Sequence, residues 1–435
     1  MRDLVFVNAS QVVTCAGPPR ARKGDEMREA GILRNTAVAV RDGRVAALGS
    51  AEDLRSAYTD AQIVDCRNGV LTPGLVDSHT HAVFGKPRFE EQELRAQGRG
   101  YMEIARWGGG IHASVRDLRE RSEDELFDLA VPRLRALASY GATTVEIKSG
   151  YGLSLDDELK SLRVIERLGK TLPLRIVGTW LGAHEIPHEY RGSAETRHQF
   201  LHHLIDEQLP AVAEHGIARF ADVFCEPGVF TLDETRQILE AARRAGLVPK
   251  LHADELEPSG GAELAAELGA ASADHLAAIS EAGIAALAAS ETVAVLLPGT
   301  MLFLGKEKQA PARALIDAGA AVALATDFNP GTSPTVNFPL MLALGVSQLR
   351  MTVAEVMVAA TVNGAAALGL ADETGQISPG FAADLALFDI ADVRELPYWY
   401  GARLCVGSWK AGSPCHPYET MTKLNPRPQE HSSTG

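Results

Sequence analysis

The segment Pro73-Gly74-Leu75-Val76-Asp77-Ser78-His79-Thr80-His81 joins a short apolar run to two histidines that stand two positions apart. Alternate side chains of a β-strand point to the same face, so we expect His79 and His81 to project together from the end of one strand. An isolated His-x-His pair is as often two exposed loop histidines. The run before this pair favours a strand that delivers both imidazoles to one site.

Further apolar runs follow along the chain, and amphipathic stretches separate them. Counting the first, eight such runs end at residues 77–81, 145–148, 182–184, 222–224, 250–252, 273–275, 294–297 and 324–327. Helices are expected at 124–140, 156–168, 194–215, 232–245, 259–268 and 280–289. Strands that alternate with helices indicate parallel β/α units, and this number of strands closes a (β/α)8 TIM-type barrel over residues 71–370.

Both ends of the chain have a different texture. Residues 1–70 contain short alternating segments separated by Asp42-Gly43 and Gly49-Ser50, and similar segments return at 375–377 and 383–389. We therefore expect a small composite β-sandwich domain made by residues 1–70 and 371–415, followed by a polar tail at 416–435. The stretch 82–121, with its Gly108-Gly109-Gly110, is too long for an ordinary loop and is predicted to be a substrate-facing insertion.

The composition excludes several functional classes. The 435 residues are 46% hydrophobic and 23% charged, which is typical of a globular protein with a large core. The formal net charge is -14 and the chain has no basic run, so a nucleic-acid partner is not expected. No run approaches the roughly 18 apolar residues that a membrane span needs. Five cysteines without paired spacing argue for a reducing cytoplasm.

Histidines and one aspartate recur at the predicted strand ends. His184, His252, His275 and Asp327 each end a separate run, so they should share one edge of the barrel with the first pair. Imidazoles and a carboxylate together suit Zn²⁺ or Fe²⁺ and leave a position for water. Glu255, three residues after His252, is close enough to exchange a proton with that water. Read alone, Glu255 is also compatible with a solvated loop.

Five segments carry a resemblance to a known family. They are 79–88, Glu146-Ile147-Lys148-Ser149-Gly150-Tyr151-Gly152-Leu153, Gly182-Ala183-His184-Glu185, His252-Ala253-Asp254-Glu255 and Thr326-Asp327-Phe328-Asn329-Pro330-Gly331-Thr332. Over nearly the whole chain the sequence resembles the amidohydrolase superfamily and, in these details, its imidazolonepropionase family. The resemblance implies a hydrolase of histidine breakdown that opens the ring of 4-imidazolone-5-propanoate to give N-formimidoyl-L-glutamate. Its partner would be a small cyclic amide that bears a carboxylate.

The resemblance also assigns roles to single residues. It implies one divalent metal ion, zinc or iron (Fe²⁺/Fe³⁺), on His79, His81, His252 and Asp327, with Glu255 as the base. The implied substrate contacts, which polarise the substrate or complete its pocket, are His184, His275, Arg88, Tyr151, Asn329, Gly331 and Thr332. Two-metal relatives use a lysine on the fourth strand, whereas Lys148 ends the second, so one ion is expected. Proteins that this sequence resembles are commonly homodimers, so the resemblance also implies a homodimer.

Two other functions fit much of the same pattern. A cyclic-amidine deaminase, such as a cytosine or guanine deaminase, would use nearly the same metal set and glutamate. Arg88 and the segment 329–332 discriminate, because a nucleobase has no carboxylate to bind. The third candidate is a non-catalytic barrel that serves as a scaffold. Arg88 alone could be a surface arginine, Tyr151 could be packing, and Asn329-Pro330-Gly331 could be a plain turn.

Overall fold

A parallel barrel forms the centre of the computed structural model, which describes residues 3–99, 103 and 108–418. Its eight strands pair in chain order from β8 to β15. They are β8 Leu75–Asp77, β9 Ala142–Lys148, β10 Arg175–Ala183, β11 Ala218–Cys225, β12 Val248–Ala253, β13 Ser272–His275, β14 Val293–Leu296 and β15 Val322–Leu324. Nearly all of their side chains are buried, as expected for a parallel sheet covered by helices. The predicted (β/α)8 barrel is confirmed.

The barrel closes just beyond the ends of its first and last strands. The amide of Asp327 donates to the carbonyl of His79 at 3.0 Å, and the amide of His81 donates to the carbonyl of Phe328 at 2.9 Å. Asp77 adds a side-chain link, because its carboxylate accepts from the backbone amide of Thr326 at 3.0 Å and from its hydroxyl at 2.7 Å. The seam of the barrel therefore runs through the segments that carry the predicted metal ligands.

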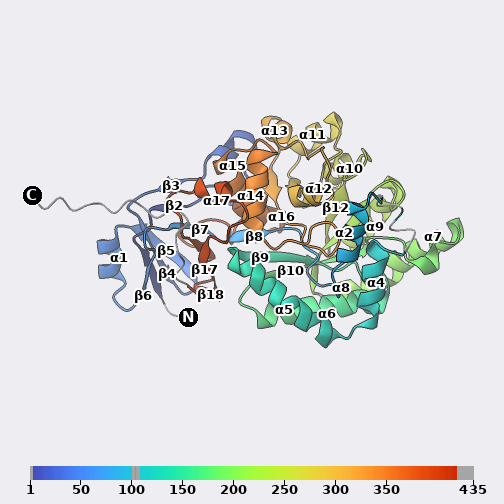
Figure 1. Cartoon of the computed structure of the whole chain (residues 1–435), viewed down its shortest axis with the longest axis horizontal. Coiled ribbons are helices and arrows are strands. Elements are labelled where there is room, and N and C mark those ends of the chain that lie inside the picture. The colour runs from blue at the N-terminus through green and yellow to red at the C-terminus, as the bar shows by residue number, and fades with distance from the viewer. Residues whose placement is uncertain (1–2, 100–102, 104–107, 419–435) are drawn as a thin grey trace, which may run out of the picture.

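Helices surround this barrel (Figure 1). They include α5 Glu123–Ser139, α6 Leu155–Thr171, α7 Ala194–His202, α8 Leu209–His215, α9 Leu232–Arg244, α10 Gly261–Glu267, α11 Glu281–Ala288 and α14 Phe338–Ser347. Several begin at a capping box, as at Ser122 and Thr231, where a hydroxyl accepts from an amide and a glutamate reaches back. The expected helix at 194–215 is interrupted by a π-helical turn, His203–Gln208, between α7 and α8.

Further helices lie before, between and after these along the chain. They are η1 Gly24–Arg28, α1 Ala51–Ala57, α2 Phe89–Ala96, α4 Ile111–Glu120, η2 His188–Tyr190, α12 Pro298–Phe303, α13 Ala312–Asp317, α15 Val353–Val358, η4 Ala359–Asn363, α16 Gly364–Ala367 and α17 Glu395–Tyr398. The predicted insertion at 82–121 contains α2 and α4. Among the described residues, no helix combines the length and apolarity needed to cross a membrane.

A two-sheet domain at one end of the molecule combines both ends of the chain, as the blue and red segments of Figure 1 show. One sheet has the order β5-β4-β1-β6 and the other β18-β17-β16-β7-β2-β3. Their strands are β1 Leu4–Val7, β2 Gln11–Val13, β3 Ile32–Leu33, β4 Ala37–Arg41, β5 Arg44–Gly49, β6 Gln62–Asp65, β7 Val70–Pro73, β16 Leu385–Phe388, β17 Cys405–Lys410 and β18 Ser413–His416. The expected composite β-sandwich is therefore present.

Two details of that expectation differ from the structure. The segment 375–377 is not a strand, because Gly375 has a φ of +87° and lies against the backbone of Thr361, which makes it part of a turn. Strand β18 extends through His416, the first residue of the predicted tail, because its backbone pairs with Ser408. The remaining tail prediction for 419–435 lies outside the described residues.

Candidate active site

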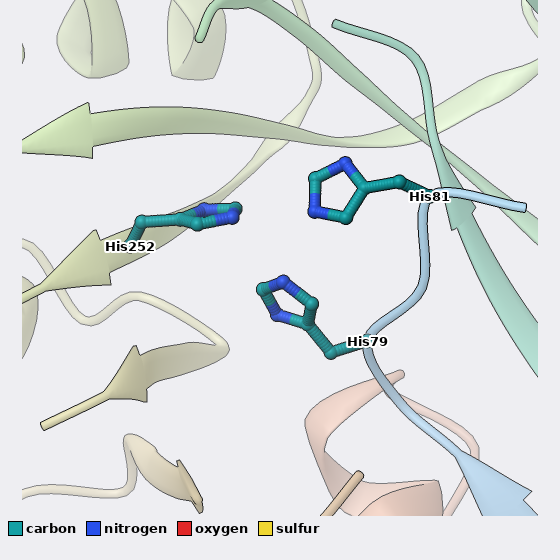
Figure 2. Close-up of side chains that lie close together, drawn as sticks. All are labelled: His79, His81 and His252. Carbon is teal, nitrogen blue, oxygen red and sulfur yellow. The ribbon is translucent and has the colours of Figure 1, made fainter. Parts of the chain in front are cut away.

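Three histidine side chains converge at the C-terminal end of the barrel strands (Figure 2). His79 and His81 follow β8, and His252 lies on β12. One ring nitrogen from each lies within 4.8 Å of the others, and all three side chains are buried. Asp327 approaches from beyond β15, with its Oδ1 at 3.6 Å from Nε2 of both His79 and His81. The structure thus brings together all four residues that the sequence suggested as metal ligands.

The nitrogens at this point fit a bound cation. Nε2 of His79 and Nε2 of His252 are buried and have no hydrogen-bond partner. Leaving such buried polar atoms unsatisfied is costly, so a group that accepts their lone pairs is expected there. The opposite ring nitrogens face carboxylates: Nδ1 of His79 lies 2.6 Å from Asp274 and Nδ1 of His252 lies 3.0 Å from Asp222. That arrangement turns each Nε2 lone pair toward the centre of the site.

Electrostatics keep the imidazoles of His79 and His81 neutral. Burial and the neighbouring Lys148 and histidines lower the pKa of His79 well below its ordinary value, and burial with His184 and His252 does the same for His81. A neutral imidazole has the free lone pair that a metal needs. Burial raises the pKa of Asp327 to about 6, although Thr300 stabilises its charged form by donating to Oδ2 at 2.6 Å.

Glu255 lies beside this group on the segment after β12. Its Oε2 is 3.6 Å from Nε2 of His275, a residue at the end of β13. Burial, followed by the charges of Asp327 and Glu226, raises the pKa of Glu255 well above the usual value for a glutamate. A carboxyl group with a raised pKa can both take up and release a proton.

A second glutamate fixes the backbone that carries Glu255. The Glu226 carboxylate accepts hydrogen bonds from the amides of Glu255 and Leu256, both at 3.2 Å, and of Glu257 at 2.8 Å. Consecutive amides bound to one buried carboxylate leave that segment little freedom. Asp254, just before it, has a φ of +49° and caps the next turn by accepting from the amides of Ser259, Gly260 and Ala262.

His184 and Tyr151 form another wall of the site. The His184 ring stacks on His81 with a centroid distance of 5.2 Å, and its Nδ1 donates to the carbonyl of Gly150 at 2.9 Å. Burial lowers the pKa of His184 to about 3, so the ring is neutral and its Nε2 is a hydrogen-bond acceptor. Glu158 holds the loop of Tyr151 by accepting from the amides of Gly150, Gly152 and Leu153 at 2.8–3.2 Å.

Arg88 and the loop after β15 are packed against each other. A Cβ atom on Gly331 would collide with the Arg88 guanidinium, whose Nε also lies 3.1 Å from Glu91. Asn329 shapes this loop, because its Oδ1 accepts from the amides of Gly331 and Thr332, both at 2.8 Å. Its Nδ2 donates to the carbonyl of Asp327 at 2.7 Å. The turn-forming interpretation of Asn329-Pro330-Gly331 is therefore correct, and the turn lies at the site.

A cavity of about 1740 Å³ opens above these residues. Most of the residues predicted for the site line it, namely His81, Arg88, Tyr151, His184, His252, Glu255, His275, Asp327, Asn329 and Thr332. The insertion contributes Arg88, Arg95 and His112 to its wall, as expected for a substrate-facing segment. His79 lies beneath the cavity floor, and Gly331 packs behind Arg88. The structure therefore brings most of the residues suggested by the sequence to one cavity, and the roles that the resemblance implies for them stay predictions.

Comparison with known proteins identifies the family. The model of the amidohydrolase family matches residues 70–423, and that of the bacterial imidazolonepropionase-like composite domain matches residues 37–61. The imidazolonepropionase of Geobacillus sp. (strain WCH70) is 48% identical over 92% of this chain and 95% of its own length. That of Solibacter usitatus is 46% identical over 95% and 98%. This chain belongs to the imidazolonepropionase family of amidohydrolases.

Solved structures place this family member in a wider group with the same fold. A 5-methylcytosine deaminase from Klebsiella pneumoniae superposes with a TM-score of 0.72 over 97% of this chain and 99% of its own, at 17% identity. An adenosine deaminase from Xanthomonas campestris, solved with bound zinc, gives a TM-score of 0.66 at 21% identity. Likeness at such low identity shows the shared barrel and does not transfer an activity.

Sequence reasoning missed several buried charges in this family member. Lys148, Asp222, Lys250 and Asp274 are fully buried within the barrel, directly behind the histidines, and Glu226 lies under Glu255. A signal for them was present, because parallel strands are normally apolar throughout and these strands carry charges at alternate positions before their ends. Lys250, for example, lies two residues before His252 on the same face of β12.

Proposed function

We propose that this chain hydrolyses 4-imidazolone-5-propanoate to N-formimidoyl-L-glutamate in histidine breakdown. The observation that carries the proposal is the convergence of His79, His81, His252 and Asp327 below a cavity that also contains Glu255 and Arg88. The first group suits a single divalent cation, and the second suits a carboxylate-bearing substrate. The high identity to curated imidazolonepropionases over almost the full chain supports the same activity.

Glu255 is the proton-transfer group in this proposal. His79, His81, His252 and Asp327 would hold a divalent cation, which would supply Lewis acidity to lower the pKa of a water molecule and to polarise a carbonyl group. Glu255 accepts the proton of the attacking water and later delivers it to the ring nitrogen that leaves as the C–N bond breaks. Its raised pKa suits both transfers, because it makes the carboxylate a stronger base toward water while the carboxyl group can still return the proton.

The two remaining histidines have different tasks. The N–H of neutral His275 donates to the oxyanion that forms when the ring carbonyl is attacked, since this ring lies 3.6 Å from Glu255 on the same side of the site. His184 spends its Nδ1 proton on Gly150, so its Nε2 accepts an N–H from the substrate ring. The Tyr151 ring lies beside the His184 ring, with the two centroids 5.5 Å apart.

Arg88 sets the preference for a carboxylate substrate. Arg88 is 7% exposed and its guanidinium is held by Gly331 and Glu91, so it binds the propanoate group as a preorganised fork. A nucleobase has no such group, and the deaminase likeness concerns the fold alone. No observation favours the deaminase alternative. The scaffold alternative leaves the buried Nε2 atoms of His79 and His252 without partners.

Incubation with freshly generated 4-imidazolone-5-propanoate tests the proposal. We expect its ultraviolet absorbance to decay and N-formimidoyl-L-glutamate to accumulate in equal amount. Cytosine and guanine serve as control substrates and should release no ammonia. Ammonia release from a nucleobase together with an unchanged imidazolone would contradict the proposal.

We also propose a cellular location, an oligomeric state and a set of domain boundaries. A cytoplasmic location is supported by the five cysteines, all of which are free thiols and four of which are buried. A homodimer is proposed because the chain belongs to a family in which this assembly is expected. The only other partner proposed is the small-molecule substrate. The division at residues 70, 370 and 415 is proposed for the domains. Light scattering of the purified protein tests the homodimer, which predicts twice the 46.4 kDa mass of one chain.

A further inference from the structure

A buried ammonium group lies directly behind the histidines. Nζ of Lys148, at the end of β9, is 2.8 Å from Asp222, 3.0 Å from Glu146 and 3.5 Å from Asp274. All four side chains have no exposed surface. They come from β9, β11 and β13, so the ammonium joins strands on different sides of the barrel interior.

The two aspartates that Lys148 contacts are the ones that hold the histidines. Asp274 Oδ2 accepts from Nδ1 of His79 at 2.6 Å. Asp222 receives the backbone amide of His252 at 3.1 Å on Oδ1, and its Oδ2 lies 3.0 Å from Nδ1 of His252. The order of contacts is therefore ammonium, carboxylate and imidazole on two separate branches. Each branch ends at an unpartnered Nε2 that faces the centre of the site.

The same ammonium occupies a second group of candidate ligands. His79, Glu146 and Asp274 also lie close enough to share a cation, but Lys148 already contacts both carboxylates of that group. Burial alone would lower the pKa of Lys148, yet the charges of Asp222, Glu146 and Asp274 outweigh it and raise the pKa above its ordinary value. The side chain is thus a permanent cation at neutral pH.

We propose that Lys148 is the positioning residue of the metal site, which acts through Asp274 and Asp222 to fix the His79 and His252 rings. This rests on the proposed function, because it assumes that the histidines bind a cation. Without the ammonium, two buried carboxylates repel each other at the place where each must hold a ring. The imidazoles then lose their fixed orientation, and the affinity for the metal falls.

Lys250 provides a matched control within the same interior. It is also fully buried and contacts Glu146 at 2.9 Å and the carbonyl of Ser78 at 3.2 Å. Its charge, like that of Lys148, favours the ionised form of Asp274, but among the described residues no hydrogen bond or ion pair joins Lys250 to Asp222 or Asp274. Replacing either lysine by methionine, a side chain of similar volume, removes one buried ammonium group from the same cluster. A purely structural role predicts similar losses for both variants.

The experiment compares metal binding by the wild-type chain, Lys148→Met and Lys250→Met. Each protein is stripped of metal, and its Zn²⁺ affinity is measured by competition with a chromophoric chelator, with the thermal midpoint of the metal-free form recorded alongside. We expect one ion per wild-type chain, an affinity reduced roughly 10- to 100-fold in Lys148→Met, and a change of less than about 3-fold in Lys250→Met.

The outcomes separate this inference from the function on which it rests. A wild-type chain that binds no ion contradicts the proposed function before any variant is compared. Equal losses in both variants, or no loss in Lys148→Met, overturn the role of Lys148. If Lys148→Met does not fold, the charge-balanced variant Lys148→Met with Asp274→Asn replaces it. That variant should bind more weakly than Asp274→Asn alone, because the Asp222 branch is lost as well, and equal affinity overturns the role.

Discussion

Gly331 is the residue whose lack of a side chain matters most to the site. In Gly331→Ala the new methyl group meets the buried Arg88 guanidinium, which must move away. We expect KM for 4-imidazolone-5-propanoate to rise roughly 10-fold or more, since a displaced charged hydrogen bond costs about 1.5–3 kcal/mol. Steady-state kinetics measures this, and metal content should stay at the wild-type level. An unchanged KM would show that Arg88 does not bind the substrate carboxylate.

Glu226 should position the base, Glu255, without taking part in proton transfer itself. In Glu226→Gln the amide N–H group faces the amides of Glu255, Leu256 and Glu257, so at least one of these bonds is lost. We expect kcat to fall on the order of 10- to 100-fold with little change in KM, because a base displaced by about 1 Å is poorly placed for proton transfer. Rapid-quench or steady-state assays give both constants.

Two variants calibrate that result. Glu255→Gln removes the base itself and should lower kcat by roughly 10²- to 10⁴-fold while the metal stays bound. Glu257→Gln changes one exposed charge on the same segment and keeps every backbone bond to Glu226, so it should behave as wild type. Wild-type kcat in Glu226→Gln would contradict the positioning role.

At the scale of elements, helix α4 of the insertion meets the loop after β10 through two histidines. The rings of His112 and His188 stack with centroids 4.1 Å apart. Burial, followed by the charges of Arg191, His188 and Arg116, lowers the pKa of His112 from 6.5 to about 4. The folded contact therefore favours the neutral ring, and its stabilisation is complete above pH 6.5 and is lost as the pH falls through about 4.

Hydrogen exchange can follow this contact. Between pH 7 and pH 4.5 we expect the protection of residues 108–121 to fall more than that of the barrel strands, after correction for the intrinsic rate. His112→Phe keeps an aromatic ring without a titrating nitrogen and should remove the extra loss. His202→Asn, on the exposed surface of α7, is the matched control. The same profile in His112→Phe and wild type would assign the pH dependence to other groups.

The elements also show what the sequence could predict. The strand ends and most helices were located, because apolar periodicity and capping residues such as Ser122 are local features. The π-helical turn His203–Gln208 was missed, since an added residue in a helix leaves no mark in the composition. Residues 375–377 were assigned to a strand although Gly375 adopts a positive φ, which only its neighbours in space reveal.

At the site, the candidate metal ligands could be predicted from the sequence, but the charged residues that hold them in place could not. His79, His81, His252 and Asp327 stand at strand ends that any barrel brings together. Lys148, Asp222 and Asp274 are distant in sequence and become partners only when β9, β11 and β13 face the same interior. The pairing of Glu226 with the segment of Glu255 likewise depends on neighbouring strands β11 and β12.

At the scale of the whole molecule, the sandwich and the barrel are joined by many contacts. The amide of Gly74 donates to the carbonyl of Asp384 at 2.8 Å, and the hydroxyl of Ser408 donates to the carbonyl of Ala138 at 3.0 Å. Arg175 on β10 pairs with Glu373 at 2.6 Å and with buried Asp384 at 3.3 Å. We therefore expect the two parts to unfold together.

Trp409 tests this coupling from the far side of the molecule. Its ring packs edge-on against Phe6 with a centroid distance of 4.9 Å and joins the cores of the two sheets. Trp409→Ala should lower the free energy of unfolding by about 3–5 kcal/mol and leave kcat unchanged at 25 °C. Urea titration followed by both circular dichroism and residual activity should give one common transition. Separate transitions would show that the sandwich unfolds independently.

The hydrogen bonds that close the barrel have a consequence for how the protein responds to its cation. Asp327 and the His79–His81 pair are separated by almost the whole barrel sequence, yet their backbones form the joint between the first and last strands. An ion bound by these side chains would cross-link the first and last strands of the barrel. Because such linkage is reciprocal, a firmer joint must also hold the ion more tightly. The thermal midpoint of unfolding and the affinity for the cation should therefore rise and fall together across variants whose substitutions lie far from this joint.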